Sequence, residues 1–201
     1  LYANEENHFW FIVRKEFIYN NMKKYIDKNS KIIEIGAGTG NVTKYLKQNG
    51  YTNISVGEIH LRGLKYAKSY GINECYQFNL LDSPFEKEFD AVCMFDVLEH
   101  INDDEKALLN ANKMLKDDGF IVLTVPANMW LWSKHDRIVG HKRRYTKKQL
   151  IEKLERNGFK VVFARYFFIS IVPLLFLRKL IKKDNAQENI KESREDVTTL
   201  N

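Results

Sequence analysis

The chain has 201 residues, 44% hydrophobic and 29% charged, with 3 prolines and 10 glycines, which fits a soluble globular domain and excludes a collagen-like or low-complexity chain. Its two cysteines, Cys75 and Cys93, lie too far apart in sequence to indicate a disulfide framework or a cysteine-built zinc site, so a reducing compartment fits. The net charge is +6, and basic residues gather between positions 134 and 183, which indicates either a region that meets an anionic group or a solvated basic face.

Hydrophobic residues at helical spacing predict a leading helix over residues 9–25. Short apolar runs then alternate with helical patterns. The predicted strands are 31–35, 54–59, 74–78, 89–95, 120–125 and 160–166, and the further helices are 41–48, 61–69, 103–115 and 146–157. This alternation predicts an α/β fold, namely a Rossmann-like, doubly wound, mostly parallel sheet with helices on both faces. Residues 126–145 form a long irregular segment, and such segments are usually functional or disordered.

The two ends of the chain carry little targeting information. Residues 1–6 lack the basic and apolar segments of a signal peptide. The most apolar stretch, 166–177, is shorter than the ~20 residues that span a bilayer. Residues 184–201 are polar and are interpreted as a tail or a cut end. We therefore expect a cytoplasmic protein, with peripheral membrane contact as an option.

The most informative segment, residues 34–40, places three glycines between a predicted strand and a predicted helix. Glycine there lets the backbone turn sharply and approach a ligand. Glu58, at the end of the second strand, can accept hydrogen bonds from both hydroxyls of a ribose. The glycine spacing is GxGxG, whereas dinucleotide sites have GxGxxG. The carboxylate of Glu34 also suits a cationic amino group, whereas a pyrophosphate would gain no favourable interaction from it. S-adenosylmethionine, with its adenosine, amino acid end and sulfonium, fits these features.

Segment 34–40 and Glu58 resemble the first two motifs of the class I S-adenosylmethionine-dependent methyltransferases, more closely the methyltransferase type 11 and ubiquinone O-methyltransferase-like members. Three later segments continue the resemblance in the right order: 79–85, 89–100 and 115–120. The resemblance covers roughly residues 31–166 and implies the class I fold. A seventh strand, which the family's sheet usually has beside the fifth, is not identifiable in this sequence.

The resemblance also implies a domain layout and a set of cofactor-binding residues. We predict a single domain over 1–183, with an N-terminal helical lid (1–28), a cofactor-binding core (31–166) and an apolar, basic helix (167–183). That last helix either contacts a membrane surface or packs on the sheet. The predicted cofactor-binding residues are Trp10, Arg14, Glu34, Gly36, Ala37, Gly38, Thr39, Gly40, Glu58, Ile59, Asn79, Leu80, Phe95 and Asp96.

Histidines near the fourth strand and in segment 126–145 are the candidate general bases, because imidazole can take a proton near neutral pH. They are His100, His135 and His141. For substrate binding we predict Trp130, Arg143, Arg144 and Tyr145, with the two arginines holding an anionic group. The alternatives are that His100 caps or packs the start of a helix, that His135 and Asp136 form a pair that stabilises the loop, and that Arg143 and Arg144 are exposed and solvated. Glu99, His100 and His135 could hold a metal ion, but nothing in their spacing requires one, so no metal is predicted.

We therefore predict S-adenosylmethionine-dependent methyl transfer to a small or lipid-linked acceptor, at oxygen. A second hypothesis is a non-catalytic module that keeps the fold and docks on an anionic partner or a membrane surface. An NAD-dependent oxidoreductase is disfavoured by the GxGxG spacing. Nucleic acid is an unfavoured acceptor, because the aromatic residues expected of a stacking platform are not evident. The sequence does not indicate an oligomeric state.

Overall fold

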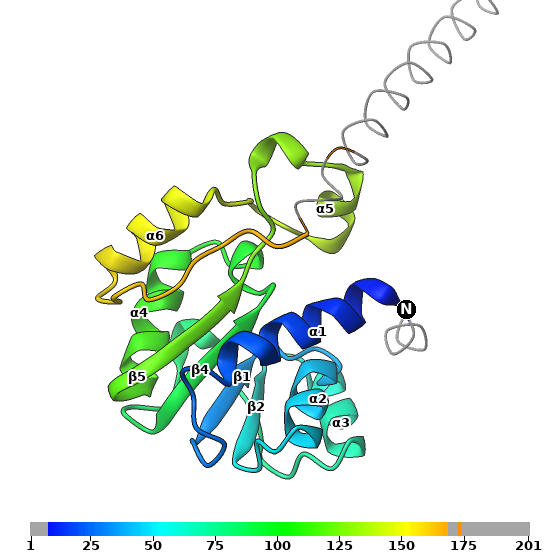
Figure 1. Ribbon diagram of the computed structural model, residues 1–201, viewed down its shortest axis with the longest axis vertical. Coiled ribbons are helices and arrows are strands. Elements are labelled where there is room, and N and C mark those ends of the chain that lie inside the picture. Colours follow the sequence, from blue (N-terminus) through cyan, green and yellow to red (C-terminus); the bar gives the residue numbers. More distant parts are fainter. Residues whose placement is uncertain (1–7, 169–172, 174–201) are drawn as a thin grey trace, which may run out of the picture.

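The computed structural model describes residues 8–168 and residue 173. Its centre is a parallel sheet of five strands in the order β3-β2-β1-β4-β5 (Figure 1). The strands are β1 (Ile32–Ile35), β2 (Ile54–Glu58), β3 (Cys75–Gln77), β4 (Phe89–Phe95) and β5 (Leu115–Thr124). The order reverses direction between β1 and β4, and in open α/β sheets ligands bind beside that point, at the carboxyl ends of the strands.

Helices connect the strands and cover both faces of the sheet, as the sequence predicts. They are α1 (Phe9–Met22), α2 (Asn41–Gln48), α3 (Leu61–Ser69), α4 (Asp104–Met114), α5 (Lys134–Val139) and α6 (Lys147–Arg156). Within the described residues, three short 3-10 turns join them: η2 (Leu80–Asp82), η3 (Leu98–His100) and η4 (Met129–Leu131). The segment with η4 and α5 lies beyond the carboxyl end of β5 (Figure 1).

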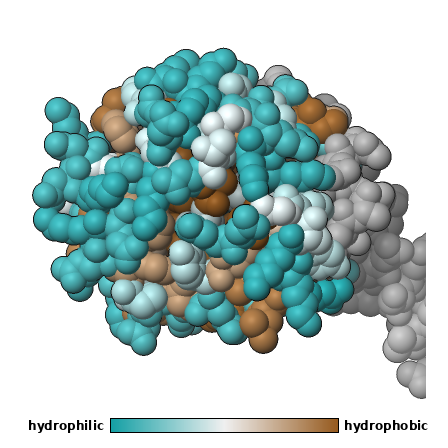
Figure 2. All heavy atoms as spheres, turned by 90° about the horizontal axis from the view of Figure 1, so that it is seen from below, coloured by the Kyte–Doolittle hydropathy of each residue, from teal (hydrophilic) through white to brown (hydrophobic). Residues whose placement is uncertain are grey.

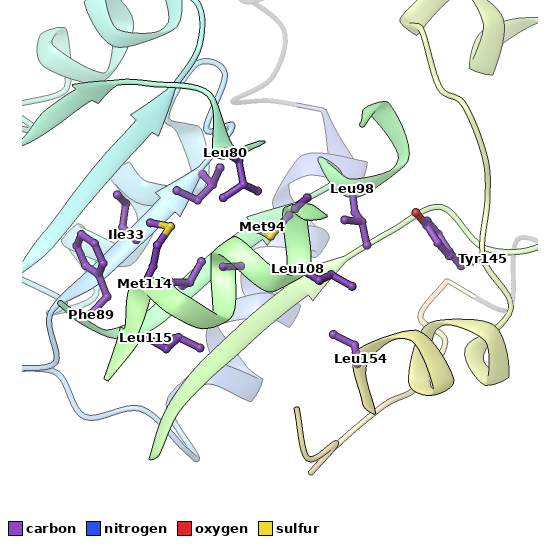
Figure 3. Close-up of a cluster of buried hydrophobic side chains, with 14 residues drawn as sticks. Ile33, Leu80, Phe89, Met94, Leu98, Leu108, Met114, Leu115, Tyr145 and Leu154 are labelled. Carbon is purple, nitrogen blue, oxygen red and sulfur yellow. The ribbon is translucent and has the colours of Figure 1, made fainter. Parts of the chain in front are cut away.

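Alternating side chains along β1 divide the core into two layers. Ile33 faces a cluster that α4 and α6 complete with Leu108 and Leu154 (Figure 3). Ile32 faces the opposite side, where α1 and α2 contribute Ile18 and Leu46. Because all four residues of β1 are buried, the strand is fixed from both faces and holds the loop that follows it in a defined position.

The C-terminal part of the predicted sheet differs from the structure. Residues 160–166 were predicted as a sixth strand, but they form no strand. A strand needs a partner for its backbone hydrogen bonds, and within the described residues the outer edge of β5 pairs with none. The apolar run is also less buried than its composition suggests, since Val162 is 60% exposed. The Tyr166 hydroxyl instead accepts a hydrogen bond from the Lys147 backbone N–H, at 2.9 Å.

β5 starts earlier than predicted, at Leu115, which pairs with Phe89 across a register shift.

Most of 167–183 and all of 184–201 lie outside the described residues. In the described part of the chain, no helix is both long and apolar enough to cross a membrane. The face at the amino ends of the strands is mostly hydrophilic (Figure 2).

Candidate functional site

The loop from Gly36 to Gly40 lies at the carboxyl end of β1, and its backbone requires glycine. Gly36 has φ +65°, and a Cβ there would lie 2.7 Å from Val97 Cγ2. Gly40 has φ +74° and forms the N-cap of α2. L side chains rarely adopt such angles. The loop can therefore curl tightly and leave its backbone open to a ligand.

Glu34 is a buried carboxyl at the base of this loop. It is 3% exposed, and the Thr43 hydroxyl on α2 donates a hydrogen bond to its Oε2. Burial raises the pKa of Glu34 to about 7, although the Thr43 hydrogen bond and the charge of Arg14 act to lower it. A cationic ligand in contact with this carboxyl would favour its ionised form.

A cavity of about 140 Å³ lies between this loop and α1, lined among others by Phe11, Arg14 and Glu34. Arg14 Nη2 lies 2.7 Å from Asp96 Oδ2. Arg14 Nε is buried and has no hydrogen-bond partner among the described residues. An unpartnered guanidinium N–H and a buried carboxyl on one cavity match the carboxylate and the ammonium of an amino acid. These residues therefore fit the amino acid end of S-adenosylmethionine.

The leading helix presents Arg14 to this cavity, as predicted, but not Trp10. Trp10, predicted to bind the cofactor, stacks on Phe168 with ring centroids 4.2 Å apart. Arg14 lines the cavity together with Phe11, which the sequence offered as the alternative to Trp10. The reason is helical geometry, since residues three apart share a face and adjacent residues point about 100° apart.

Glu58 lies at the end of β2, as predicted, and is 7% exposed. Its Oε2 accepts from the Gly38 N–H at 3.1 Å, and its Oε1 accepts from the His60 N–H at 3.0 Å. These bonds hold the glycine loop against β2. Each oxygen keeps further acceptor capacity, so a ribose-binding role stays open. Ile59, also predicted at the cofactor, is 50% exposed beside it.

The remaining predicted cofactor residues follow β3 and β4. Asn79 caps η2, because its Oδ1 accepts from the Leu81 N–H at 3.0 Å, and Leu80 is buried. Phe95 is buried and lines the cavity. Asp96 adopts φ +57°, and its Oδ1 accepts from the Thr124 hydroxyl at 3.0 Å. Their contact with a cofactor stays a prediction.

A second group of polar side chains lies at the same sheet edge: Glu99 and His100 follow β4 on η3, and His141 comes from the segment after α5. Their ligand-type atoms all lie within 4.8 Å of one another. The Lys142 N–H donates to the Glu99 carbonyl at 2.7 Å, which fixes the distant loop to η3. Burial, reinforced by the charge of Asp96, raises the pKa of Glu99 to about 8. Burial, and then the charge of His141, lowers the pKa of His100.

The His141 ring is oriented by Asp136, a buried carboxylate on α5. His141 Nδ1 lies 2.8 Å from Asp136 Oδ1. Arg144 holds the same carboxylate through Nε at 2.8 Å and Nη2 at 3.0 Å. Burial acts to raise the pKa of Asp136, but hydrogen bonds from Arg144, His141 and Ser133 hold it well below its usual range. Since an ionised carboxylate only accepts, Nδ1 carries the hydrogen, and Nε2 of a neutral ring is left as an acceptor.

The residues predicted to bind substrate have internal partners instead. Arg144 binds Asp136, as described above, and Arg143 Nη1 lies 2.7 Å from Asp104 Oδ2. The buried Tyr145 hydroxyl donates to the same Asp104 oxygen at 2.7 Å. These three side chains therefore stabilise the loop, whereas the alternative weighed from the sequence was that Arg143 and Arg144 are exposed and solvated. Trp130 is 50% exposed.

Of the three predicted histidines, the structure brings together His100 and His141, whereas His135 is exposed on α5. The sequence suggested Asp136 as a loop-stabilising residue but with His135 as its partner, and it did not suggest Asp104 as an anchor of the loop. Each aspartate meets its partners across an intervening turn or helix, and no local spacing signals such a contact.

Comparisons with known proteins relate this chain to methyltransferase domains. The family model described as a methyltransferase domain matches residues 9–163. An uncharacterized protein of Methanocaldococcus jannaschii is 35% identical over 128 residues, 62% of this chain and 46% of that protein. A ubiquinone biosynthesis O-methyltransferase of Rickettsia bellii is 24% identical over 119 residues, 56% of this chain and 49% of that protein. The chain thus spans about half the length of these curated relatives.

Solved structures share the fold. One is a SAM-dependent methyltransferase of Thermotoga maritima, described as a possible histamine N-methyltransferase. It superposes with a TM-score of 0.61 at 23% identity and covers 80% of this chain and 78% of its own. At this identity the likeness concerns the fold alone.

Proposed function

Since the chain belongs to the family of methyltransferase domains, we propose that it transfers a methyl group to a hydroxyl oxygen of a small or lipid-linked acceptor. S-adenosylmethionine is the methyl donor that the family and the similar solved structures imply. When bound, it supplies a sulfonium methyl group that a nucleophile can attack in line, which breaks the methyl–sulfur bond and leaves the neutral thioether S-adenosylhomocysteine. The chain's own residues must then hold both molecules and take up the proton of the acceptor.

The cofactor would lie along the carboxyl ends of β1 and β2. Glu34 would bind the ammonium of its amino acid end, and Arg14 would bind the carboxylate. Glu58 lies on the adjacent strand, two residues beyond Val56, which pairs with Glu34. It would accept hydrogen bonds from the ribose hydroxyls. Both oxygens of Glu58 already accept backbone N–H groups, so its position is fixed before any ligand arrives.

The observation that carries the choice of a hydroxyl acceptor is the pairing of His141 with Asp136. An imidazole whose Nδ1 is held at 2.8 Å by a buried carboxylate presents Nε2 in a fixed direction, beside Glu99. A hydroxyl must lose its proton during methyl transfer, and such a site can accept one. The O-methyltransferase from Rickettsia bellii, although distant, supports the same choice.

Exposed apolar side chains on the segment that follows β5 favour an acceptor with an apolar part. Met129 is 52% exposed and Ile138 is 72% exposed. Lys134 and Lys142 are exposed nearby in sequence. Apolar and cationic groups on one loop suit an amphiphilic or lipid-linked acceptor.

The test is an assay of S-adenosylhomocysteine formation with catechol, catechol carrying a long alkyl chain, and the matching aromatic amine. We expect methylation of the hydroxyl compounds, faster with the alkyl chain. We also expect a fall of at least about 100-fold in His141→Gln and no change in Glu155→Gln, whose side chain is exposed on α6. Methylation of the amine alone would refute oxygen as the target. Cofactor binding without turnover on any acceptor would favour the non-catalytic module.

A further inference from the structure

Glu99 is a buried carboxyl that the fold, in the part of the chain that the structure describes, leaves without a hydrogen-bond partner. It is 0% exposed, and neither carboxylate oxygen accepts a hydrogen bond from another residue among those the structure describes. Burying a polar group without a hydrogen bond costs free energy, so buried polar atoms in folded proteins nearly always have partners. A group of this kind points to a ligand that completes it.

Two imidazoles lie around this carboxyl. His141 Nε2 is 3.7 Å from Glu99 Oε1, and the rings of His100 and His141 are in edge contact with centroids 4.7 Å apart. In a tetrahedral zinc site with bonds of about 2.0–2.1 Å, ligand atoms lie about 3.3 Å from each other. The Glu99–His141 pair is already close to that separation, and small side-chain rotations would bring in His100.

The environment of His141 is that of a metal ligand. Its Nδ1 is held by Asp136, which leaves Nε2 to face Glu99. Histidines that bind metals usually present their other ring nitrogen to a carboxylate or carbonyl, which fixes the ring and raises its basicity. Asp136 is itself fixed by Arg144 and by the Ser133 N–H at 2.8 Å, so the ring position is determined by residues outside the cluster.

From this arrangement we infer that Glu99, His100 and His141 bind one divalent cation of the zinc class. Two nitrogen ligands and one oxygen ligand suit Zn²⁺, Co²⁺ or Mn²⁺ better than Mg²⁺ or Ca²⁺, which prefer oxygen. Three protein ligands leave a coordination position open, as in catalytic zinc sites.

The consequence for catalysis rests on the proposed function, whereas the cation site does not. Through its open coordination position, the cation would bind the acceptor hydroxyl and lower the pKa of that hydroxyl. His141 would then act as a ligand, and the cation would replace the free imidazole in activating the hydroxyl. The site lies at the same edge of the sheet, the carboxyl ends of the strands, as the cavity that Arg14 and Phe95 line.

The structure also changes which histidine belongs to the set. The sequence offered Glu99, His100 and His135 as a candidate group. His135 is exposed on α5 and is not part of the cluster, whereas His141 is. His135→Ala is therefore a matched control for His141→Ala, because both remove an imidazole from the same loop.

The experiment is a titration of the chelator-stripped chain with Co²⁺, followed by visible absorption, and with Zn²⁺, followed by calorimetry. We expect one equivalent to bind, with the strong absorption of a four- or five-coordinate cobalt ion. We expect Glu99→Gln and His141→Ala each to weaken binding by at least about 10-fold, and His135→Ala to leave it unchanged. Circular dichroism checks that each variant is folded, and His100→Ala replaces any variant that is not.

Failure of the folded wild-type chain to bind one equivalent would overturn the inference. So would binding that survives both Glu99→Gln and His141→Ala, or binding that requires His135. None of these readouts needs turnover. A cation site without methyl transfer would therefore refute the proposed function alone, and methyl transfer without cation binding would refute this inference alone.

Discussion

Replacing Glu34 by glutamine should stabilise the cofactor-free protein at alkaline pH and leave it unchanged at acidic pH. Glutamine has nearly the same shape, and its side-chain oxygen can still accept the hydrogen bond from Thr43. What the substitution removes is a carboxyl that becomes charged where water cannot reach it, since Glu34 is 3% exposed. The effect therefore isolates the cost of burying that charge.

The size and sign of the effect follow from the pKa of Glu34. The folded state raises it from 4.5 to about 7. A carboxyl with a raised folded-state pKa binds its proton more tightly when folded, so its cost is absent below about pH 4.5. The cost grows as pH rises and is complete above about pH 7, where it reaches about 3 kcal/mol. We expect Glu34→Gln to gain about 1–3 kcal/mol at pH 8.

The assay is urea unfolding followed by circular dichroism at pH 4.5 and pH 8, with Glu155→Gln as the exposed control, expected within about 0.5 kcal/mol of wild type at both. The buried carboxyl of Glu99 is present in all variants, so its contribution to the free energy of unfolding cancels when they are compared with wild type. Calorimetry should show that the same variant binds S-adenosylmethionine at least about 10-fold more weakly, because an ionic hydrogen bond is lost. Equal stability of Glu34→Gln and wild type at pH 8, or a larger gain at pH 4.5, would refute the reasoning.

Three further outcomes are expected. Leu108→Ala should lower the free energy of unfolding by about 2–5 kcal/mol, because Leu108 is 0% exposed in the core; a loss under about 1 kcal/mol in urea unfolding would contradict that packing. Gly36→Ala should abolish cofactor binding in calorimetry, because its Cβ would lie 2.7 Å from Val97 Cγ2 at φ +65°; wild-type affinity would show that the loop adapts. Asp136→Ala should cost about 3–5 kcal/mol, since it leaves the guanidinium of Arg144 without its carboxylate; a double variant with Arg144→Met should recover part of that loss in thermal unfolding, and no recovery would argue against the pairing.

Local patterns were enough to predict the first four strands, the helices between them and the glycine loop. The apolar runs around Ile33 and Val92 are buried on both faces, so their composition reports their environment directly. The glycines and Glu58 were also recognisable, because their chemistry depends on short spacings and on the fixed order of strands and helices. These features predict a cofactor site at the ends of β1 and β2 without any knowledge of distant contacts.

Contacts between distant segments decided the rest. Residues 160–166 have the composition of a strand, but strand formation depends on a neighbour, and none pairs with them in the described chain. The sequence pattern around Arg143 and Arg144 suggested groups open to a substrate, yet Asp104 and Asp136 neutralise both. Charge alone cannot tell a free cation from one paired across the fold.

The histidines around Glu99 also show the difference between what the sequence determines and what the tertiary structure determines. The sequence by itself identified His100, His135 and His141 as residues able to move a proton or bind a metal, because that ability belongs to the side chain. Only the tertiary structure placed His141 beside Glu99 and turned His135 outward. The physical reason is that the loop's position is fixed by the buried carboxylate of Asp136 and the backbone bond to Glu99, which are contacts that no local sequence pattern encodes.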